Sequence, residues 1–492
     1  MRTERICFSS IGYGKVKSMH LWSDRPCISR TSRFDSGEVS AVQHEILVTD
    51  DFKPKRLPAY RVPENLKESV NTQIKQLLDL GIIKPSKSPM SSPVVCVIKG
   101  QKPIDGKITP DKVRICVNYQ YVNKFTVPDV LPLPNISEVI QRVGNAKFIS
   151  LFDARSGYHQ LPVKFDDQWL TGFVCDLGFF EFTRCPFGMR SSGASFVRAI
   201  HEIINPIREF VEAYVDDMAV YSDDWTKHLN HINEYLLHIK NSGLTLNLSK
   251  CEFAKPEIKY VGHIVGSGKR LPDPEKVEAV MNLKVPESKK QVRQIMGLFS
   301  HFRDYIPLFS EVAKPITDLT LKRVPSRVPW GREQQNSFDD LKHLLCRAVQ
   351  QPLSIIVPGR PFCLYVDASD YAVGCVLGQC DVTGKEQPVA FASSKFTTTQ
   401  CNWATIEKEA YACIWALQKY RHWLFGSVTT LYSDHNPLTY LSESSPKSAK
   451  LMRWALALQE FNILFRYRAG RLNQAADCVS RMVSLDELQS SQ

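Results

Sequence analysis

The sequence predicts an α+β unit, then a helical stretch, then an α/β unit. Strand-like and helix-like patterns alternate from about residue 46, helical patterns dominate between Pro272 and about Leu345, and a second mixed pattern opens at Pro361. The chain has 492 residues, of which 43% are hydrophobic and 23% are charged. This composition is typical of globular proteins, and the length accommodates about three domains.

The first unit is expected to begin its regular structure with a helix after Pro63. Proline suits the first helical turn, Gly81 follows the last periodic residue, and Leu66, Val70 and Ile74 recur at helical spacing. Short apolar runs predict three strands, at 93–99, 113–119 and 147–153, and two hairpins, at 173–182 and 211–222. Two more helices are expected at 188–210 and 223–242.

The last unit is expected to alternate strands with helices. Its predicted strands cover 362–367, 372–379, 387–396 and 428–434, and its predicted helices cover 405–425, 447–459 and 472–480.

Residues 1–45 are Ser-rich and aperiodic, so we expect a poorly ordered extension, and residues 483–492 are expected to be a short tail.

Charge and apolar patterning restrict the function. The formal net charge is +11, which favours a polyanionic partner. No apolar run reaches the roughly 18–20 residues that a membrane helix needs, so no membrane partner is expected. The first residues lack the apolar core of a signal peptide, which indicates an intracellular protein and leaves its compartment open between the cytoplasm and the nucleus. The 14 cysteines lack C-x-x-C pairs and are expected to be reduced thiols.

Three acids of the first unit are predicted to share one location. Asp153 ends a predicted strand, and Asp216 and Asp217 lie at the turn of an apolar hairpin. Carboxylates from neighbouring strands can hold two divalent cations about 3.5–4 Å apart for phosphoryl transfer. Mg²⁺ suits such oxygen ligands, with Mn²⁺ as an alternative. Alternation along the hairpin favours Asp216 over Asp217 as a direct ligand.

The runs around these acids resemble the reverse transcriptase of gypsy-like LTR retrotransposons. The matching runs include VRICVNYQYVNK, FDARSGYHQLPV, CPFGM, YVDDMAVYS and LTLNLSKCEF. The resemblance implies a fingers–palm–thumb polymerase hand, with Asp153, Asp216 and Asp217 as its catalytic acids. It places the fingers and palm at 46–264 and a helical thumb and linker at 265–354.

The resemblance also implies roles for residues outside the acid cluster. Tyr158 would pack under the incoming sugar, where a flat ring would clash with a ribose 2′-hydroxyl. A fork of guanidinium hydrogen bonds suits Arg114 to the triphosphate, and Lys250 could protonate the leaving pyrophosphate. The implied nucleotide-binding set is Arg114, Lys99, Tyr158, Phe187, Gly188 and Lys250, and the implied primer-positioning turn is Gly262 and His263.

Three positions depart from the family pattern. The family carries Asp and Arg where this chain has Asn118 and Gln120, and it carries Gln where this chain has Val197. The first two changes together remove an ion pair. A Gln can form a hydrogen bond near the templating base, whereas Val cannot. None of the three replaces a predicted metal ligand.

Four further acids are predicted to form a second metal site within 355–482. Asp367 and Asp434 end strands, Glu409 lies early on the long helix, and Asp477 lies on the last helix. The runs YVDASDYAVGCVLGQ, TIEKEAYACIWAL and LYSDHNPLTYL resemble the RNase H of the same retroelements, which implies an α/β RNase H-like domain with a two-metal nuclease site. Glu407 lies two residues away, but the resemblance selects Glu409.

The resemblance implies an RNA- and DNA-directed DNA polymerase with an RNase H activity that degrades the RNA of hybrids during retrotransposon replication. Its implied partners are an RNA template, a DNA primer, an RNA–DNA hybrid and dNTPs, and its implied cofactor is Mg²⁺, two ions per site. The sequence leaves the oligomeric state open. The alternative is a domesticated retroelement relic that binds nucleic acid through its positive charge without polymerase activity.

Overall fold

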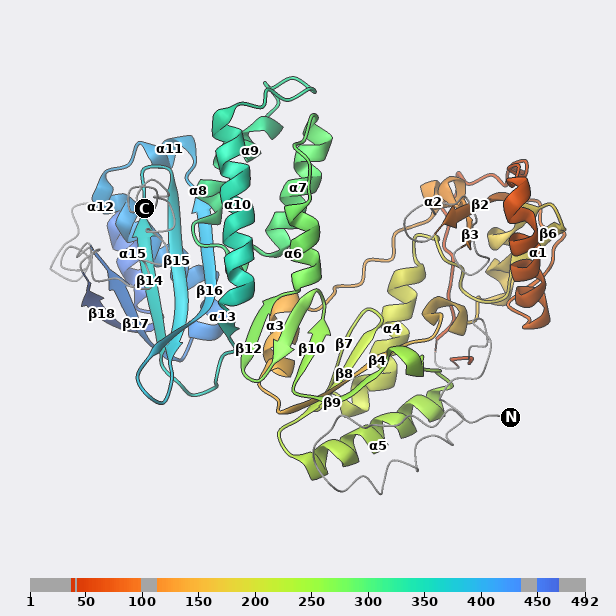
Figure 1. Ribbon diagram of the computed structural model, residues 1–492, viewed down its shortest axis with the longest axis horizontal. Helices are drawn as coiled ribbons and strands as arrows, with labels where there is room; N and C mark the ends of the chain where they lie inside the picture. Colours follow the sequence, from red (N-terminus) through yellow and green to blue (C-terminus); the bar gives the residue numbers. More distant parts are fainter. Residues whose placement is uncertain (1–36, 40–41, 99–112, 435–448, 469–492) are drawn as a thin grey trace, which may run out of the picture. The chain divides into compact units, whose positions relative to one another are not determined.

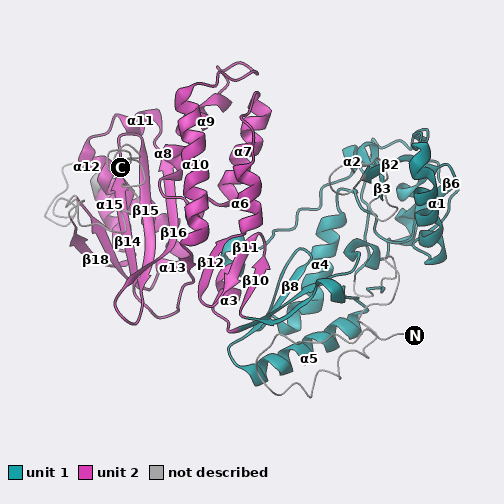
Figure 2. Ribbon diagram, in the orientation of Figure 1, with its two compact units in different colours: residues 1–139, 148–255 teal, residues 140–147, 256–492 magenta. Residues whose placement is uncertain are grey.

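The computed structural model describes residues 37–39, 42–98, 113–434 and 449–468 (Figure 1). The chain divides into two compact units: residues 1–139 with 148–255, and residues 140–147 with 256–492 (Figure 2). The expected helix at 472–480, the tail at 483–492 and most of the expected N-terminal extension lie outside the described residues. None of the described helices is long and apolar enough to cross a bilayer.

The first unit contains a five-stranded sheet of order β1-β6-β5-β2-β3. Its strands are Ile83–Pro85 (β1), Ser92–Ile98 (β2), Val113–Val117 (β3), Phe173–Cys175 (β5) and Gly178–Phe182 (β6). Helix α1 (Glu64–Asp79) buries the predicted stripe of Leu66, Val70 and Ile74. These side chains join one hydrophobic core with the strands, which explains why the stripe has helical spacing.

The second sheet of this unit has the order β7-β8-β4-β9. Its strands are Phe148–Asp153 (β4), Val211–Tyr214 (β7), Asp217–Ser222 (β8) and Glu252–Lys255 (β9), and two long helices belong to the same unit, Ser192–Ile204 (α4) and Trp225–Ser242 (α5). Asp224 caps α5 by accepting a hydrogen bond from the Lys227 N–H at 3.0 Å, and Gly243 ends it with φ of +77°. The predicted hairpin and helix are therefore confirmed.

One predicted strand is shorter than expected. The run 113–119 stops at Val117, and a short helix, Gln120–Phe125 (α2), follows. The side-chain oxygen of Asn118 accepts a hydrogen bond from the Gln120 N–H at 3.1 Å. This local turn competes with strand pairing, which explains the early end of the strand.

The N-terminal stretch begins to pack earlier than the sequence indicates. Val39 and His44 are fully buried. Their N–H groups donate to the carbonyls of Gln160 and Pro162 at 2.9 and 2.8 Å, and the His44 ring is 2.9 Å from the Ser195 hydroxyl. The expectation of poor order up to residue 45 is therefore wrong for residues 37–39 and 42–45. These contacts are made with distant residues, so the Ser-rich segment itself carries no periodic signal.

The second unit begins with a small sheet and a group of helices. The sheet has the order β10-β11-β12-β13. Its strands are Glu257–Tyr260 (β10), His263–Gly266 (β11), Lys269–Pro272 (β12) and Leu353–Ser354 (β13); the helices are Pro274–Met281 (α6), Lys289–His301 (α7), Phe309–Val312 (α8), Lys314–Thr317 (α9) and Arg332–Gln350 (α10). Helix α7 begins with a capping box between Ser288 and Gln291. The predicted helical stretch is thus confirmed.

The rest of the second unit is a five-stranded sheet of order β16-β15-β14-β17-β18. Its strands are Phe362–Ala368 (β14), Ala372–Cys380 (β15), Glu386–Lys395 (β16), Val428–Ser433 (β17) and Asn462–Tyr467 (β18); its helices include Thr405–Lys419 (α12) and Ala449–Leu458 (α15). Strand β14 is antiparallel to β15 and parallel to β17. Helix α12 packs Ala412, Cys413 and Ala416 into the core of this sheet.

A buried histidine connects α5 to two strands of the β7-β8-β4-β9 sheet. The ring nitrogens of His228 lie 2.9 Å from the Ser150 hydroxyl and 3.0 Å from the Ser222 hydroxyl. Ser150 also accepts a hydrogen bond from the Ala254 N–H at 2.9 Å, so its own hydroxyl is free to donate to His228. Burial lowers the pKa of His228 from 6.5 to about 4. The neutral imidazole is therefore the form that this fold stabilises.

We predict that the first unit loses stability in mild acid. A histidine whose pKa is lowered in the folded state adds its full stabilisation to the free energy of unfolding above pH 6.5. This stabilisation is lost as the pH falls toward 4. For His228 the loss between pH 7 and pH 5 is about 2 kcal/mol. In urea denaturation, His228→Asn should reduce the pH dependence of the unfolding free energy by about this amount. Exposed His422 provides the control: equal effects of His228→Asn and His422→Asn would contradict the prediction.

Candidate active sites

The three acids predicted for the first unit gather at one end of the β4–β8 strand pair. Asp153 is the last residue of β4, and the register places it opposite Asp217, the first residue of β8. Asp216 lies in the turn between β7 and β8, directly after Val215, whose φ is +58°. A β-branched residue rarely adopts this conformation. The turn thus accepts strain at the position that precedes Asp216.

Asp153 is held by two side chains from the segment before β9. The Lys250 ammonium donates to Asp153 Oδ1 at 3.0 Å, and the Asn247 amide donates to Oδ2 at 3.4 Å. The Asn247 N–H also donates to the Asp153 carbonyl at 2.9 Å. Lys250 is therefore a direct partner of an acid in this structure. The sequence analysis did not identify Asn247, because its contact depends on a loop 94 residues further along the chain.

A cleft of about 690 Å³ opens beside these acids. Asp153, Asp216 and Lys250 line it together with Arg114 of β3 and Phe187. The structure thus brings the predicted triphosphate-binding arginine to the same cleft as the acids. Lys99 lies outside the described residues.

Tyr158 lies at the edge of this acid cluster. Its ring makes edge contacts with Phe187 and Phe196, at centroid distances of 5.0 and 5.4 Å. Burial raises the pKa of Tyr158, and the negative charge of Asp216 raises it further. Next to Phe187, Gly188 has φ of +94°, which favours glycine. The ring and this turn form an apolar wall close to the carboxylates.

The predicted primer-positioning turn belongs to the second unit. Gly262 has φ of +83°, and His263 begins β11. The His263 side chain is only 4% exposed, and it stacks between His301 and Tyr305 with centroid distances of 5.0 and 5.5 Å. The imidazole therefore faces the interior of this unit. A ligand at the turn would meet Gly262 and the backbone rather than this ring.

Three of the four acids predicted for the last unit converge. Suitable carboxylate oxygens of Asp367, Glu409 and Asp434 lie within 4.8 Å of one another. Asp367 lies in β14 and Asp434 directly follows β17, and these neighbouring strands are parallel, so both carboxylates emerge at one edge of the sheet. Asp477 lies outside the described residues.

The structure distinguishes Glu409 from its neighbour Glu407. Glu409 is 2% exposed and belongs to the acid cluster. Glu407 instead pairs with Lys450 on α15, with 3.2 Å between the charged atoms. The assignment of Glu409 therefore agrees with this geometry.

A further acid, Glu311 of α8, was missed by the sequence analysis. Burial raises its pKa, and the nearby charge of Asp367 contributes in the same direction.

Both acid clusters offer carboxylate oxygens to a cation. Hard divalent cations such as Mg²⁺ prefer oxygen ligands of this kind, whereas softer cations prefer thiolate or imidazole ligands. Gathering carboxylates without a cation is unfavourable because their charges repel. The donor set of Asp367, Glu409 and Asp434 therefore fits Mg²⁺ or Mn²⁺, and Asp153 and Asp216, which line one cleft, offer ligands of the same kind.

Comparisons with known sequence families identify both regions. The family described as "Reverse transcriptase (RNA-dependent DNA polymerase)" matches residues 100–265, and the "RNase H-like domain found in reverse transcriptase" matches residues 357–461. The chain therefore contains a reverse transcriptase region and an RNase H-like region, in that order. The acids of the first cluster fall within the first match, and Asp367, Glu409 and Asp434 fall within the second.

Curated relatives are Pol polyproteins of transposons. The chain is 36% identical over 454 residues to that of transposon opus and 32% identical over 455 residues to that of gypsy, both from Drosophila melanogaster. Each alignment covers 90% of this chain, and covers 44% of the opus protein and 43% of the gypsy protein. The chain thus spans less than half the length of these relatives.

Solved structures support the fold. A foamy viral protease-reverse transcriptase in complex with double-stranded DNA has a TM-score of 0.77 and 22% identity, covering 89% of this chain and 76% of the other. The same viral enzyme in complex with an RNA/DNA hybrid has a TM-score of 0.67 and 23% identity, covering 89% and 58%. The predicted polymerase hand followed by an RNase H-like domain is confirmed.

We predict that Glu409, and not Glu407, is required for divalent cation binding in the second unit. Glu409→Gln removes one buried negative charge from the cluster and should weaken Mn²⁺ binding to this site at least about tenfold. Isothermal titration with Mn²⁺, in an Asp216→Asn background that weakens the first site, measures this change. Glu407→Gln should retain the wild-type affinity, and a loss of affinity in both variants would contradict the assignment.

Proposed function

We propose that this chain is an RNA-directed and DNA-directed DNA polymerase that also degrades the RNA strand of RNA–DNA hybrids during retrotransposon replication. The observation that carries the proposal is the presence of two separate carboxylate clusters, one in each compact unit. Each cluster lies within the residues that match the corresponding enzyme family. The fingers and palm at 46–264, the thumb and linker at 265–354 and the RNase H at 355–482 are part of this proposal.

The polymerase site is proposed to use Asp153 and Asp216 as its main cation ligands, with Asp217 in support. Bound Mg²⁺ ions would supply Lewis-acid stabilisation of the reacting phosphate oxygens. Lys250 lies 3.0 Å from Asp153 and is well exposed, so its ammonium can turn toward a leaving pyrophosphate and donate a proton. Arg114 lines the same cleft, where it can hold the triphosphate with paired hydrogen bonds.

The nucleotide pocket is proposed to select deoxynucleotides through Tyr158. The ring is fixed by its contacts with Phe187 and Phe196, so it cannot move away without disturbing both neighbours. A fixed aromatic wall excludes an additional hydroxyl by steric overlap. Lys99, Phe187 and Gly188 complete the proposed nucleotide-binding set, and Gly262 with His263 forms the proposed primer-positioning turn.

The nuclease site is proposed to use Asp367, Glu409 and Asp434, with Asp477 as a fourth ligand. The acids are carried by two parallel strands and a helix whose inner face is buried, and this support keeps the carboxylates in place. The proposed substrate is an RNA–DNA hybrid, with an RNA template, a DNA primer and dNTPs for the polymerase. An intracellular location, in a cytoplasmic particle or the nucleus, follows from this role.

We predict that the two activities can be separated by single substitutions. Asp216→Asn removes a ligand charge from the first site and should reduce primer extension on poly(rA)–oligo(dT) by at least about a hundredfold, while hybrid cleavage persists. Asp434→Asn should have the reverse effect. Both are measured with Mg²⁺ and the purified chain.

The same experiment tests the alternative of a relic that only binds nucleic acid. That alternative requires a folded wild-type chain that binds a primed template but extends no primer. Primer extension that survived Asp216→Asn would remove the first cluster from the proposed polymerase site.

We predict that Tyr158→Ala relaxes discrimination against ribonucleotides. Removing the ring removes the steric block, and one excluded group contributes roughly tenfold to a hundredfold in discrimination. Competition between dNTPs and rNTPs in single-nucleotide extension measures the change. Tyr158→Phe keeps the ring and should discriminate as the wild type does; equal discrimination by Tyr158→Ala would exclude Tyr158 from this role.

A further inference from the structure

Strand β16 is an edge strand whose outer side is met by groups from the helical part of the same unit. The order β16-β15-β14-β17-β18 leaves one side of β16 without a neighbouring strand, and such edges expose backbone carbonyls. Arg270 Nη2 donates to the Val389 carbonyl and Arg303 Nη2 donates to the Ser393 carbonyl, both at 3.0 Å. Two arginines thus bind the open edge of the RNase H-like sheet.

The Arg270 contact coincides with a β-bulge. Leu377 pairs with Ala390 and Gly378 pairs with Pro388, so the register leaves Val389 without an opposite residue. A bulge interrupts the ladder and turns the backbone groups of the extra residue. The carbonyl that Arg270 binds therefore belongs to the irregular position of β16.

Arg270 is buried to an unusual degree for an arginine. It belongs to β12 and is 1% exposed. Asp304 provides an opposite charge, with 3.7 Å between Arg270 Nη2 and Asp304 Oδ2, and the guanidinium carbon lies 5.4 Å from the centre of the Tyr305 ring. Burying a charge is unfavourable unless hydrogen bonds and opposite charges compensate for the lost water. An apolar residue could fill this volume, so the guanidinium is expected to serve specificity rather than stability.

Tyr305 continues this chain of contacts to the turn at Gly262. The Tyr305 hydroxyl lies 3.0 Å from His263 Nδ1, and burial lowers the pKa of His263 to about 3, so the imidazole is neutral and can accept this bond. His263 directly follows Gly262 and pairs with Pro272 on β12. A continuous path therefore connects the bulge of β16 with the turn through Arg270, Tyr305 and His263.

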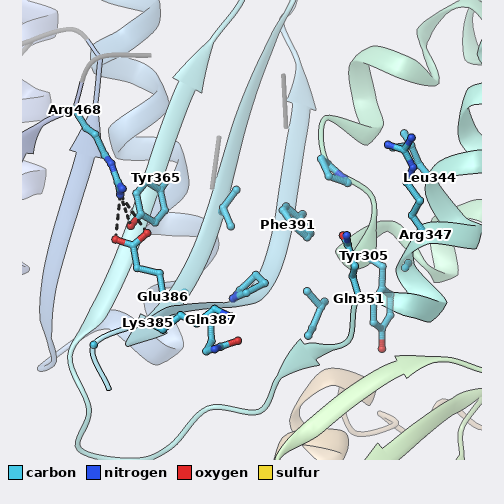
Figure 3. Close-up of a pocket in the computed structure, with 17 residues that line it drawn as sticks. Tyr305, Leu344, Arg347, Gln351, Tyr365, Lys385, Glu386, Gln387, Phe391 and Arg468 are labelled. Carbon is cyan, nitrogen blue, oxygen red and sulfur yellow. Dashed lines mark hydrogen bonds and ion pairs between the residues drawn. The ribbon is translucent and has the colours of Figure 1, made fainter. Parts of the chain in front are cut away.

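A cavity beside this path makes the alignment of the helical part and the sheet depend more on the contacts of Arg270. The cavity measures about 580 Å³, and Figure 3 shows Tyr305 and Arg347 on its helical wall and Tyr365 and Glu386 on its sheet wall. Atoms that border a cavity lose dispersion contacts on that side. Packing therefore fixes the two walls only weakly here, and directed contacts such as that of Arg270 contribute more to their alignment.

We propose that Arg270 is a positioning residue that ties the primer-side turn to the edge of the RNase H-like sheet and thereby sets the distance between a primer 3′ end and the RNA cleavage site. This inference rests on the proposed polymerase and nuclease functions. Arg270 acts through Val389 on one side and through Tyr305 and His263 on the other, without touching substrate.

The test compares the full-length wild-type chain with Arg270→Met. The substrate is a 5′-labelled RNA annealed to a DNA primer, and the readout is the distribution of cleavage positions measured from the primer 3′ end. Arg270→Met should spread a defined cluster of cuts over neighbouring positions. It should raise the KM for the primed template about tenfold to a hundredfold, the range expected for a lost hydrogen bond to a charged group, with kcat for extension within twofold.

Arg303→Met is the matched control, because Arg303 binds the same edge strand but stacks near Phe309 instead of Tyr305. It should leave the cleavage positions unchanged. Tyr305→Phe removes only the hydroxyl contact to His263 and should reproduce part of the spread, which keeps the test valid if Arg270→Met folds poorly. Equal cleavage patterns in the wild type and Tyr305→Phe, or equal effects of Arg270→Met and Arg303→Met, would overturn the inference. A wild-type chain that neither extends nor cuts would instead overturn the proposed function, and this inference with it.

Discussion

Repulsion between neighbouring carboxylates is the constraint that the rest of this structure must satisfy. Asp153 faces Asp217 across a strand pair, and Asp367, Glu409 and Asp434 converge within 4.8 Å. Such groups separate unless the backbone holds them or cations neutralise them. The backbone holds them because they lie at the ends of paired strands whose neighbouring side chains are buried, such as Phe152 and Met218 beside the first cluster. In both units, the paired strands therefore hold carboxylates of like charge close to one another.

The two units bring their carboxylates together with different strand topologies. In the first unit, antiparallel strands β4 and β8 present the end of one strand beside the start of the other, and a tight turn adds Asp216. In the second unit, parallel strands β14 and β17 present two strand ends at one edge, and a helix adds Glu409. The first cluster also contains its own cation, because Lys250 binds Asp153 directly. Among the described residues the second cluster has a different companion, the partly buried Glu311, which adds negative charge near Asp367.

Features that depend on local sequence could be predicted, and those that depend on distant contacts could not. The hairpin that carries Asp216 and the stripe of α1 follow from alternation and helical spacing over a few residues. The choice of Glu409 over Glu407 needed a resemblance, because periodicity alone does not say which residue meets Asp367. The packing of Val39 and His44, the contact of Asn247 with Asp153 and the burial of the His263 ring each join segments far apart in the chain. No local pattern records such contacts, so the sequence does not show that the His263 ring is buried while its backbone begins β11 beside the turn.

The buried polar groups of the second unit show how specificity can be obtained at the expense of stability. His263, Tyr305 and Arg270 fill a space that apolar side chains could occupy, and a buried ion pair is often no more stable than an apolar replacement. Apolar packing, however, would allow β12 to slide against β16, because dispersion has no preferred direction. A guanidinium bound to one carbonyl, at a bulge that marks one residue of the strand, fixes a single register. Within the second unit, the position of the turn at Gly262 relative to the RNase H-like sheet then depends on bonds with defined geometry.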